Sequence, residues 1–158
     1  MLTIRDFSPG DREVYLTMAH EFYHSSAVER PVPDRHFTLA FDEIMGGSPY
    51  ARGLLFELGG RPAGYALLAI TFSCEAGGLA VWAEEVYVRP DFRGHGVGGA
   101  FLQFLEEEYR GRAARLRLEV EDDNQRAIAL YQKKGYRWLN YRQMVRDFPP
   151  PVPGEPIA

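Results

Sequence analysis

Hydrophobic and polar positions in the first third of the chain follow two different periods. Weak alternation at 2–7 (LTIRDF) predicts a first strand, and near-helical spacing predicts a helix at 11–24. The apolar residues that set this helical spacing are Val14, Leu16, Met18 and Phe22. A second helix is predicted around 34–47, with Asp34 as its cap and Gly46–Gly47 as its end.

The middle of the chain has the pattern of paired strands. Aromatic and aliphatic runs at 54–58 and 63–73 flank the turn GGRP, which predicts a hairpin. Another strand-like run, LAVWAEEVYVRP, covers 79–90 and is ended by its proline. A glycine-rich loop follows.

Helical and strand-like segments alternate in the second half. The pattern predicts a helix through Arg110, a strand at 114–121 and a helix at 124–134 that stops before a glycine. A last strand or hairpin is predicted at 136–148 (YRWLNYRQMVRDF). The Pro-rich end at 149–158 cannot hold a helix or a strand ladder, so we expect a disordered tail there.

Composition narrows the class of protein. The 158 residues are 46% hydrophobic and 25% charged, as in soluble globular domains. The net charge of −4 argues against general nucleic-acid binding, which needs a basic face. No apolar run is long enough to span a membrane, so we expect neither a membrane partner nor a signal peptide.

The single cysteine also limits the chemistry. Cys74 can form no internal disulfide, which favours a reducing compartment such as the cytoplasm. No histidine lies near it in sequence, so it lacks the base that a cysteine nucleophile needs. The Cys and His residues show no metal-ligand spacing, and we expect no metal.

The glycine-rich loop, GHGVGG at 94–99, is the strongest local signal. It satisfies the dinucleotide pattern G-x-G-x-x-G, with Glu119 where a ribose-binding acid would lie. Against this, RPDFR separates the glycines from the preceding strand, and too little chain follows for a doubly wound sheet. A Walker loop is excluded because no Gly-Lys-Ser/Thr follows. A plain turn stays open as an alternative.

Two motifs together favour another interpretation. RGHGVG, which begins at Arg93, fits the pattern Arg/Gln-x-x-Gly-x-Gly at a helix start, and DDNQRAIALYQKKGYRW follows one strand later. In these two segments the chain resembles the GNAT superfamily of N-acetyltransferases, over about 80–138. The resemblance implies an α/β (α+β) fold, a single domain at 1–148 with a mixed, mostly antiparallel sheet. We expect six to seven strands and about four helices in the order β-α-α-β-β-β-α-β-α-β(-β).

The resemblance also implies acetyl-CoA as co-substrate. Bare amides at a helix start offer N–H groups and partial positive charge to a pyrophosphate, and Arg93 can add a charge-assisted bond. The strand before the loop would pair through its backbone with the pantetheine arm, and one of its amides would stabilise the developing oxyanion. The implied cofactor-binding residues are Val86, Tyr87, Val88, Arg93, Gly94, His95, Gly96, Val97, Gly98, Gly99, Asn124, Ala127 and Tyr131.

Acid–base roles follow from the same resemblance. Tyr131 would protonate the leaving thiolate; it lies seven residues after Asn124, which places both on one face of a helix. A protonated amine cannot attack a thioester, so a base is needed. Glu84 is the first candidate for this base and Glu85 the second, with Glu85 also as an acceptor-binding group. A β-bulge, usual in this strand of the family, would change which of them faces the cleft.

The acceptor is less clearly indicated. Tyr23 and His24 follow the first helix, where the family builds its acceptor pocket, and AEEVYVRPDFRGHGVG resembles polyamine and thialysine acetyltransferases. We therefore expect a small cationic primary amine that attacks directly in a ternary complex. A protein or peptide amine and a non-catalytic acyl-CoA-binding regulatory module stay open. The resemblance also allows a homodimer.

Overall fold

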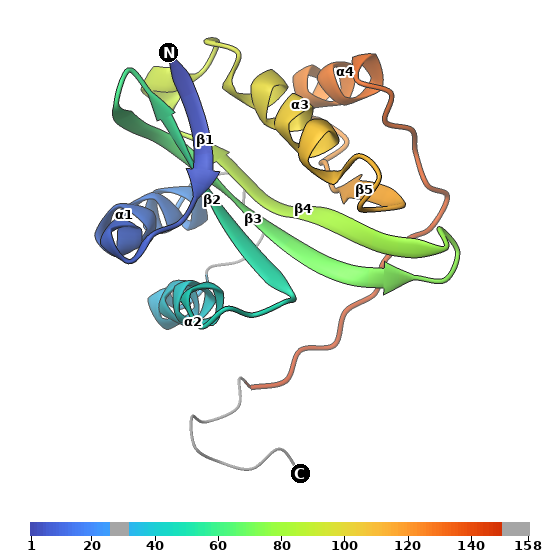
Figure 1. Cartoon of the computed structure of the whole chain (residues 1–158), viewed down its shortest axis with the longest axis horizontal. Coiled ribbons are helices and arrows are strands. Elements are labelled where there is room, and N and C mark those ends of the chain that lie inside the picture. Colours follow the sequence, from blue (N-terminus) through green and yellow to red (C-terminus); the bar gives the residue numbers. More distant parts are fainter. Residues whose placement is uncertain (26–31, 150–158) are drawn as a thin grey trace.

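One five-stranded sheet forms the centre of the computed structural model, which describes residues 1–25 and 32–149 (Figure 1). The strands follow each other in sequence order across the sheet. The first four pair antiparallel, and the fifth lies parallel to the fourth. Their bounds are β1 (Leu2–Asp6), β2 (Ala51–Leu58), β3 (Arg61–Ser73), β4 (Gly78–Val88) and β5 (Arg115–Leu118).

Helices cover both faces of this sheet (Figure 1). On one face α1 (Arg12–Tyr23) and α2 (Asp34–Met45) bury an aromatic cluster against β2 to β4. On the other face α3 (Val97–Tyr109) buries apolar side chains against the same strands, and α4 (Gln125–Lys133) packs beside it. Short 3-10 turns at Pro9–Asp11 and Pro90–Phe92 lead into the neighbouring elements.

The two cores explain why the sequence forms these layers. Tyr15 and Met18, about one turn apart on α1, and Phe37 and Phe41, one turn apart on α2, are buried on the first face. Phe101 and Leu105 do the same on the second. β3 is buried without interruption from Ala63 to Leu68, as expected for the part of a central strand that is covered on both faces. The single-sheet α/β class and the order of the first nine elements are as predicted.

The prediction of six to seven strands is wrong: the described chain contains five. Residues 136–148 pair with no strand, and the strand predicted at 114–121 ends at Leu118. A strand needs a ladder partner and a covered apolar face. This segment has no ladder partner among the described residues, and its large apolar side chains from Tyr141 onward are exposed, whereas Tyr136 packs against the α3 core. Met144 is 98% exposed and Val145 85% exposed. The expected tail at 149–158 lies outside the described residues from Pro150 onward.

Two further points of the sequence analysis are changed by the structure: the cap of α2 and the dinucleotide interpretation of the glycine loop. Asp34 is the first residue of α2, and Pro33 occupies the cap position instead. The mostly antiparallel sheet also removes the dinucleotide interpretation of the glycine loop, which requires parallel βαβ units. Among the described helices, none is long and apolar enough to cross a membrane.

Candidate active site

Strands β4 and β5 separate halfway along β4, and most of the predicted site lies around this point. The last pair between them is Ala83 with Leu118. Glu84 and Glu119 are therefore the first residues beyond the shared ladder. From Glu84 to Val88, β4 still pairs with β3, but no described strand pairs with its other edge. This leaves a row of backbone N–H and C=O groups open to a ligand.

A β-bulge lies at the same point. Glu85 pairs with Leu67 and Ala83 pairs with Leu68, so Glu84 is the extra residue on β4. The bulge interrupts the alternation of side chains along the strand. Ala83 and Val86 both pack with the α3 core, while Glu85 contacts the α1 side. The expected bulge is present, and it separates the two glutamates by environment.

Glu85 is held by two tyrosines. Tyr23 on α1 donates a short hydrogen bond to one carboxylate oxygen, and Tyr65 on β3 donates to the other at 2.9 Å. Burial raises the pKa of Glu85, while both hydrogen bonds act in the opposite direction. Tyr23 and Glu85, both predicted acceptor-side residues, thus meet directly. Because its oxygens are engaged, Glu85 is less free to accept a proton than its neighbour.

Glu84 has a different environment. It is exposed and accepts no hydrogen bond from the described residues. Desolvation by the surrounding protein raises its pKa, and the negative charge of Glu119 raises it further. A carboxylate with a raised pKa and unoccupied lone pairs is suited to take a proton near neutral pH.

The glycine loop forms an open cradle at the start of α3. Gly94 and Gly96 have φ of +82° and +80°, a region that other residues avoid. A Cβ added at either position would meet no atom within 4 Å, so the backbone is accessible. Gly96 caps α3 without any side-chain hydrogen bond, and the buried Val97 anchors the helix. Free amides at a helix N-terminus fit the chemistry of a pyrophosphate.

The polar side chains of this loop contact its own backbone. Arg93 donates through Nε to the carbonyl of Val88 at 3.0 Å, which joins the loop to the open edge of β4. His95 is exposed, with Nδ1 3.0 Å from the carbonyl of Arg93. Tyr87 directs its hydroxyl to Glu21 at 3.1 Å, away from the loop, so only its backbone is available to a ligand on that edge.

The two predicted residues at α4 lie at its N-cap and in its second turn. Asn124 is the N-cap, where its Oδ1 accepts from the N–H of Ala127 at 3.2 Å. Tyr131 is half-buried with its ring 6.0 Å from that of Tyr136, and burial raises the pKa of its hydroxyl. The phenol is therefore protonated over the neutral range, as a proton donor must be.

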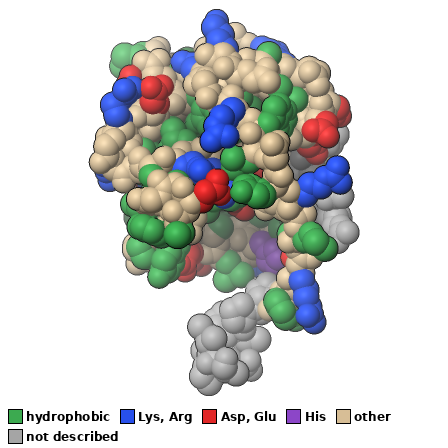
Figure 2. Space-filling model, turned by 90° about the vertical axis from the view of Figure 1, so that its right-hand side faces the viewer, with side chains coloured by type: hydrophobic (Ala, Val, Ile, Leu, Met, Phe, Trp, Pro, Cys, Tyr) green, Lys and Arg blue, Asp and Glu red, His purple; other side chains and the backbone are tan. Residues whose placement is uncertain are grey.

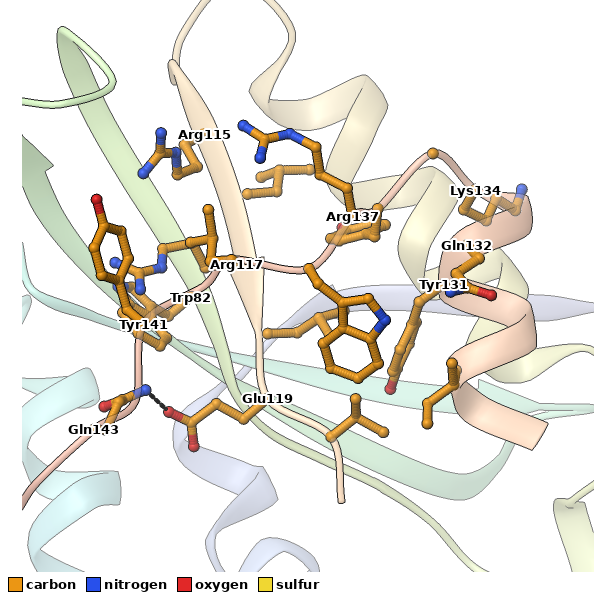
Figure 3. A pocket seen from close by; sticks show the side chains of 18 residues that line it. Trp82, Arg115, Arg117, Glu119, Tyr131, Gln132, Lys134, Arg137, Tyr141 and Gln143 are labelled. Atoms are coloured by element: carbon orange, nitrogen blue, oxygen red, sulfur yellow. Dashed lines mark hydrogen bonds between the residues drawn. The ribbon is translucent and has the colours of Figure 1, made fainter. Parts of the chain in front are cut away.

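Tyr131 lines a cavity of about 470 Å³ between β5, α4 and the segment that follows α4 (Figure 3). From β4 and β5 the lining includes Trp82, Arg117 and Glu119, and from the C-terminal segment Tyr141 and Gln143. Gln143 donates a short hydrogen bond to Glu119. On this side of the molecule, hydrophobic and charged side chains lie beside each other around a hollow (Figure 2).

The predicted acceptor residue His24 lies apart from this group, and so does Cys74, which the sequence disfavoured as a nucleophile. His24 stacks on His20, with ring centroids 3.8 Å apart, and its Nδ1 lies 2.9 Å from the carbonyl of His20. No contact joins His24 to either glutamate among the described residues. Cys74 is exposed on the turn between β3 and β4. Within residues 1–25 and 32–149, no three Cys, His, Asp or Glu side chains are grouped to hold a metal ion.

The sequence analysis missed Tyr65, Trp82 and Arg117, and it considered Glu119 only as a ribose ligand. Tyr65 reaches Glu85 through the register of β3 against β4, which no local pattern reports. Arg117 and Glu119 follow the visible alternation of β5, whose charged positions look like an ordinary solvated face. Arg117 and Glu119 become candidate site residues only because β5 separates from β4 next to them, which the sequence pattern does not show.

Comparison with known proteins gives one family match. The acetyltransferase (GNAT) family matches residues 15–136. The thialysine N-epsilon-acetyltransferase of Bos taurus is 28% identical over 141 residues, which covers 84% of this chain and 82% of that protein.

Solved structures with the same fold agree. An integron cassette protein from the Cole Harbour salt marsh metagenome superposes with a TM-score of 0.78 at 26% identity, over 94% of this chain and 91% of that one. A predicted acetyltransferase from Clostridium acetobutylicum, solved with acetyl-CoA, gives a TM-score of 0.74 at 16% identity, over 92% and 96%.

Proposed function

Because the chain belongs to the acetyltransferase (GNAT) family, we propose that it transfers the acetyl group of acetyl-CoA to a primary amine of a small cationic molecule. The observation that carries this proposal is the separation of β4 from β5. It leaves a backbone edge beside a phosphate-type loop, with carboxylates at the same point. Acetyl-CoA supplies an activated acetyl thioester.

The donor half of the site consists of the loop and the strand edge. We propose that the amides of 94–99 and the guanidinium of Arg93 hold the pyrophosphate. The open edge at Val86–Val88 would receive the amide groups of the pantetheine arm. The side chain of Arg93 already touches Val88, so loop and edge form one continuous surface. Asn124 and Ala127 at the start of α4 would close this surface.

The chemical step requires one base and one acid. Glu84 would take a proton from the ammonium group, either directly or through one water, and leave the nitrogen lone pair free to attack the thioester carbon. The C–N bond forms, the C–S bond breaks, and the hydroxyl of Tyr131 donates its proton to the departing sulfur. The nitrogen loses its second proton, which returns through solvent to the oxygen of Tyr131, and Glu84 releases its proton to solvent. Glu84 is favoured over Glu85 because Tyr23 and Tyr65 occupy the oxygens of Glu85. Glu85 then acts on the acceptor side, as part of its binding surface.

A small cation is the acceptor that the charges favour. Glu84, Glu85 and Glu119 gather around the separation of the strands, and a cationic amine is attracted to such a group. The bovine relative is named for thialysine, so we propose thialysine as the first compound to test. A protein or peptide amine is the alternative acceptor.

The test is a thiol-release assay with acetyl-CoA and a panel of amines that includes thialysine, polyamines and a lysine-containing peptide. We expect turnover with at least one small cationic amine and product mass increased by one acetyl group. Binding of acetyl-CoA without turnover of any amine would contradict the enzyme and favour a regulatory acyl-CoA-binding module.

We further propose that the acetyltransferase domain extends over 1–148 and works as a homodimer in a reducing compartment such as the cytoplasm, without nucleic acid or membrane as partner. Support for the dimer comes from the segment after α4, where Tyr141, Met144, Val145 and Phe148 are 69–98% exposed. In Figure 2 this segment projects from the body of the molecule with hydrophobic and basic side chains side by side. A second copy would cover such a surface.

A further inference from the structure

The cavity between β5 and α4 is basic at the end away from the glutamates (Figure 3). Four basic side chains contribute to it: Arg115, Arg117, Lys134 and Arg137. Of the described residues that line the cavity, Glu119 is the one acid, and Gln143 already bonds to it. The cavity therefore carries a surplus of positive charge beside an acidic reaction centre.

Arg117 is the basic residue whose position is best defined. It pairs with Trp82 across β4 and β5, and its guanidinium carbon lies 3.8 Å from the centroid of the indole ring. This stacking fixes the guanidinium plane and leaves its N–H groups at the rim free to bind. Figure 3 shows Arg117 and Trp82 together, with Tyr141 beside them.

The guanidinium of Arg117 has no acidic partner. Arg115, two residues earlier on the same face of β5, lies 3.3 Å from Glu75. Arg117 is half-buried yet forms no ion pair or hydrogen bond with any residue in the described parts of the chain. A half-buried, oriented and unpaired guanidinium is a site for a carboxylate, which it can bind with two parallel N–H···O bonds.

The spacing relates this site to the reaction centre. Arg117 and Glu119 line the same cavity; Arg117 is the third residue of β5 and Glu119 follows directly after the last residue of that strand. Two residues of extended chain span roughly 7 Å. Glu84 interacts with Glu119 across the separation of the strands. A ligand with an ammonium group at one end and a carboxylate about 7 Å away would satisfy both ends at once.

We propose that Arg117, held on Trp82, binds a carboxylate of the acceptor, so that the substrate class is an amino acid with a side-chain amine. This inference rests on the proposed function and refines it. Arg117 is a specificity residue: it touches the substrate at the end that does not react. Its contribution is therefore to acceptor affinity and to the alignment of the amine with Glu84.

The experiment compares acceptors that differ only in the carboxylate. L-lysine and thialysine carry it, whereas cadaverine and the decarboxylated analogue of thialysine keep the chain and the amine. We expect the wild-type protein to use the carboxylated member of each pair with the higher kcat/KM. In Arg117→Gln, KM for the carboxylated acceptors should rise about 10- to 100-fold with little change in kcat, while the diamines are unaffected. Arg117→Lys should restore part of the loss.

Arg137→Gln is the matched control, because it removes the same charge from the same cavity. It should leave the preference unchanged. If the wild-type protein uses diamines as well as it uses amino acids, or if Arg137→Gln alone removes the preference, the proposal about Arg117 is wrong while acetyl transfer stands.

A binding measurement separates this proposal from the proposed function. In a Trp138→Phe background the remaining tryptophan is Trp82, whose fluorescence should respond to L-lysine and not to cadaverine. An Arg117-dependent response without any acetylation would support the carboxylate site and contradict the enzyme. The absence of both a response and acetylation would contradict both proposals.

Discussion

At the scale of single residues, the two adjacent glutamates show how environment assigns different roles to identical side chains. Glu85 is half-buried and accepts hydrogen bonds from two tyrosines, whereas Glu84 lies in a bulge with its oxygens free and Glu119 nearby. Desolvation by the surrounding protein raises both pKa values, and the free oxygens of Glu84 are the reason we propose it as the base. Their chemistry is therefore separable by mutation.

We predict that Glu84→Gln lowers kcat about 100-fold near neutral pH. In the wild-type protein the rate should rise with pH through the raised pKa of Glu84. In the variant that limb should disappear, and the rate should increase only at alkaline pH, where the free amine itself becomes abundant. Glu85→Gln is the control and should keep the pH limb. An unchanged pH profile in Glu84→Gln would remove Glu84 as the base.

We predict that Tyr131→Phe lowers kcat about 10- to 100-fold because the leaving sulfur loses its proton donor. Affinity for CoA, measured by calorimetry, should stay within error. Tyr136→Phe is the control, since its ring lies 6.0 Å from that of Tyr131 and burial raises its pKa to about 12. Full activity in Tyr131→Phe would exclude it as the acid.

Asp11 makes a structural contribution that can be tested by pH. Arg5 donates two hydrogen bonds to its carboxylate, at 2.8 and 2.9 Å, and Ser8 donates two more. The Arg5 guanidinium is the largest cause that lowers the pKa of Asp11 from 3.8 to about 2. Since the folded pKa is depressed, the carboxylate stabilises the fold fully above its unfolded pKa. That stabilisation is lost as pH falls through the folded value.

We predict that Asp11→Asn reduces the free energy of unfolding at pH 7 by about 2 kcal/mol. The difference from the wild-type protein should shrink as pH falls from 3.8 toward 2, as measured by urea unfolding. Asp91→Asn, at an exposed position, is the control and should change little at either pH. If the difference in unfolding free energy between Asp11→Asn and the wild-type protein did not change with pH down to about 2, the ionised carboxylate of Asp11 would not be its cause.

At the scale of elements, the backbone of the loop before α3 both starts the helix and exposes free amide groups. Gly96 has a left-handed φ and caps the helix, so it ends the loop and exposes the first amides. Gly111, at the other end of the same helix, has a similar φ of +75° and also an open Cβ position. Replacing either glycine by alanine should therefore cause similar backbone strain, but the two glycines lie at opposite ends of α3.

We predict that Gly96→Ala and Gly111→Ala each cost about 1 kcal/mol of unfolding free energy, because alanine disfavours this φ. Only Gly96→Ala should also weaken CoA binding, by about tenfold or more, since its methyl group would lie on the pyrophosphate side. Thermal unfolding and calorimetry measure the two effects. Equal CoA affinity in both variants would contradict the assignment of the loop as the pyrophosphate site.

At the scale of the whole molecule, the segment after α4 is the part whose apolar side chains a single chain leaves exposed. It contains large apolar side chains that the rest of the described chain does not cover, next to the short edge strand β5. Exposed apolar surface of this kind marks an interaction site. The same segment supplies Gln143 to the cavity, so the proposed dimer surface and the proposed acceptor site are adjacent.

We predict that the wild-type protein has twice its chain mass of 17.9 kDa in light scattering, and that Met144→Glu combined with Val145→Glu reduces it to a single chain. Tyr50→Glu is the control, because Tyr50 is also exposed, at 71%, but lies outside this segment. A wild-type protein that is monomeric at micromolar concentration would contradict the dimer.

Local signals were enough to predict the order of the elements from β1 to α4 and to propose the donor half of the site. Periodicity, glycine turns and helix caps act over a few residues, so they can be read without knowing the fold. The loop at 94–99 belongs to this group, since bare amides at a helix start need no distant partner. For the same reason the two motifs that carry the family resemblance were visible in the sequence.

Only the tertiary structure decided which side chains meet in the acceptor half of the proposed site. The bulge that distinguishes Glu84 from Glu85 depends on the register of β3 against β4, and the hydrogen bond from Tyr65 to Glu85 spans 20 positions. The stacking of Arg117 on Trp82 depends on where β5 joins and leaves β4. The segment at 136–148 has the composition of a strand but finds no ladder partner within its own chain. Pairing, unlike periodicity, is a property of two segments at once, and no single stretch of sequence contains it.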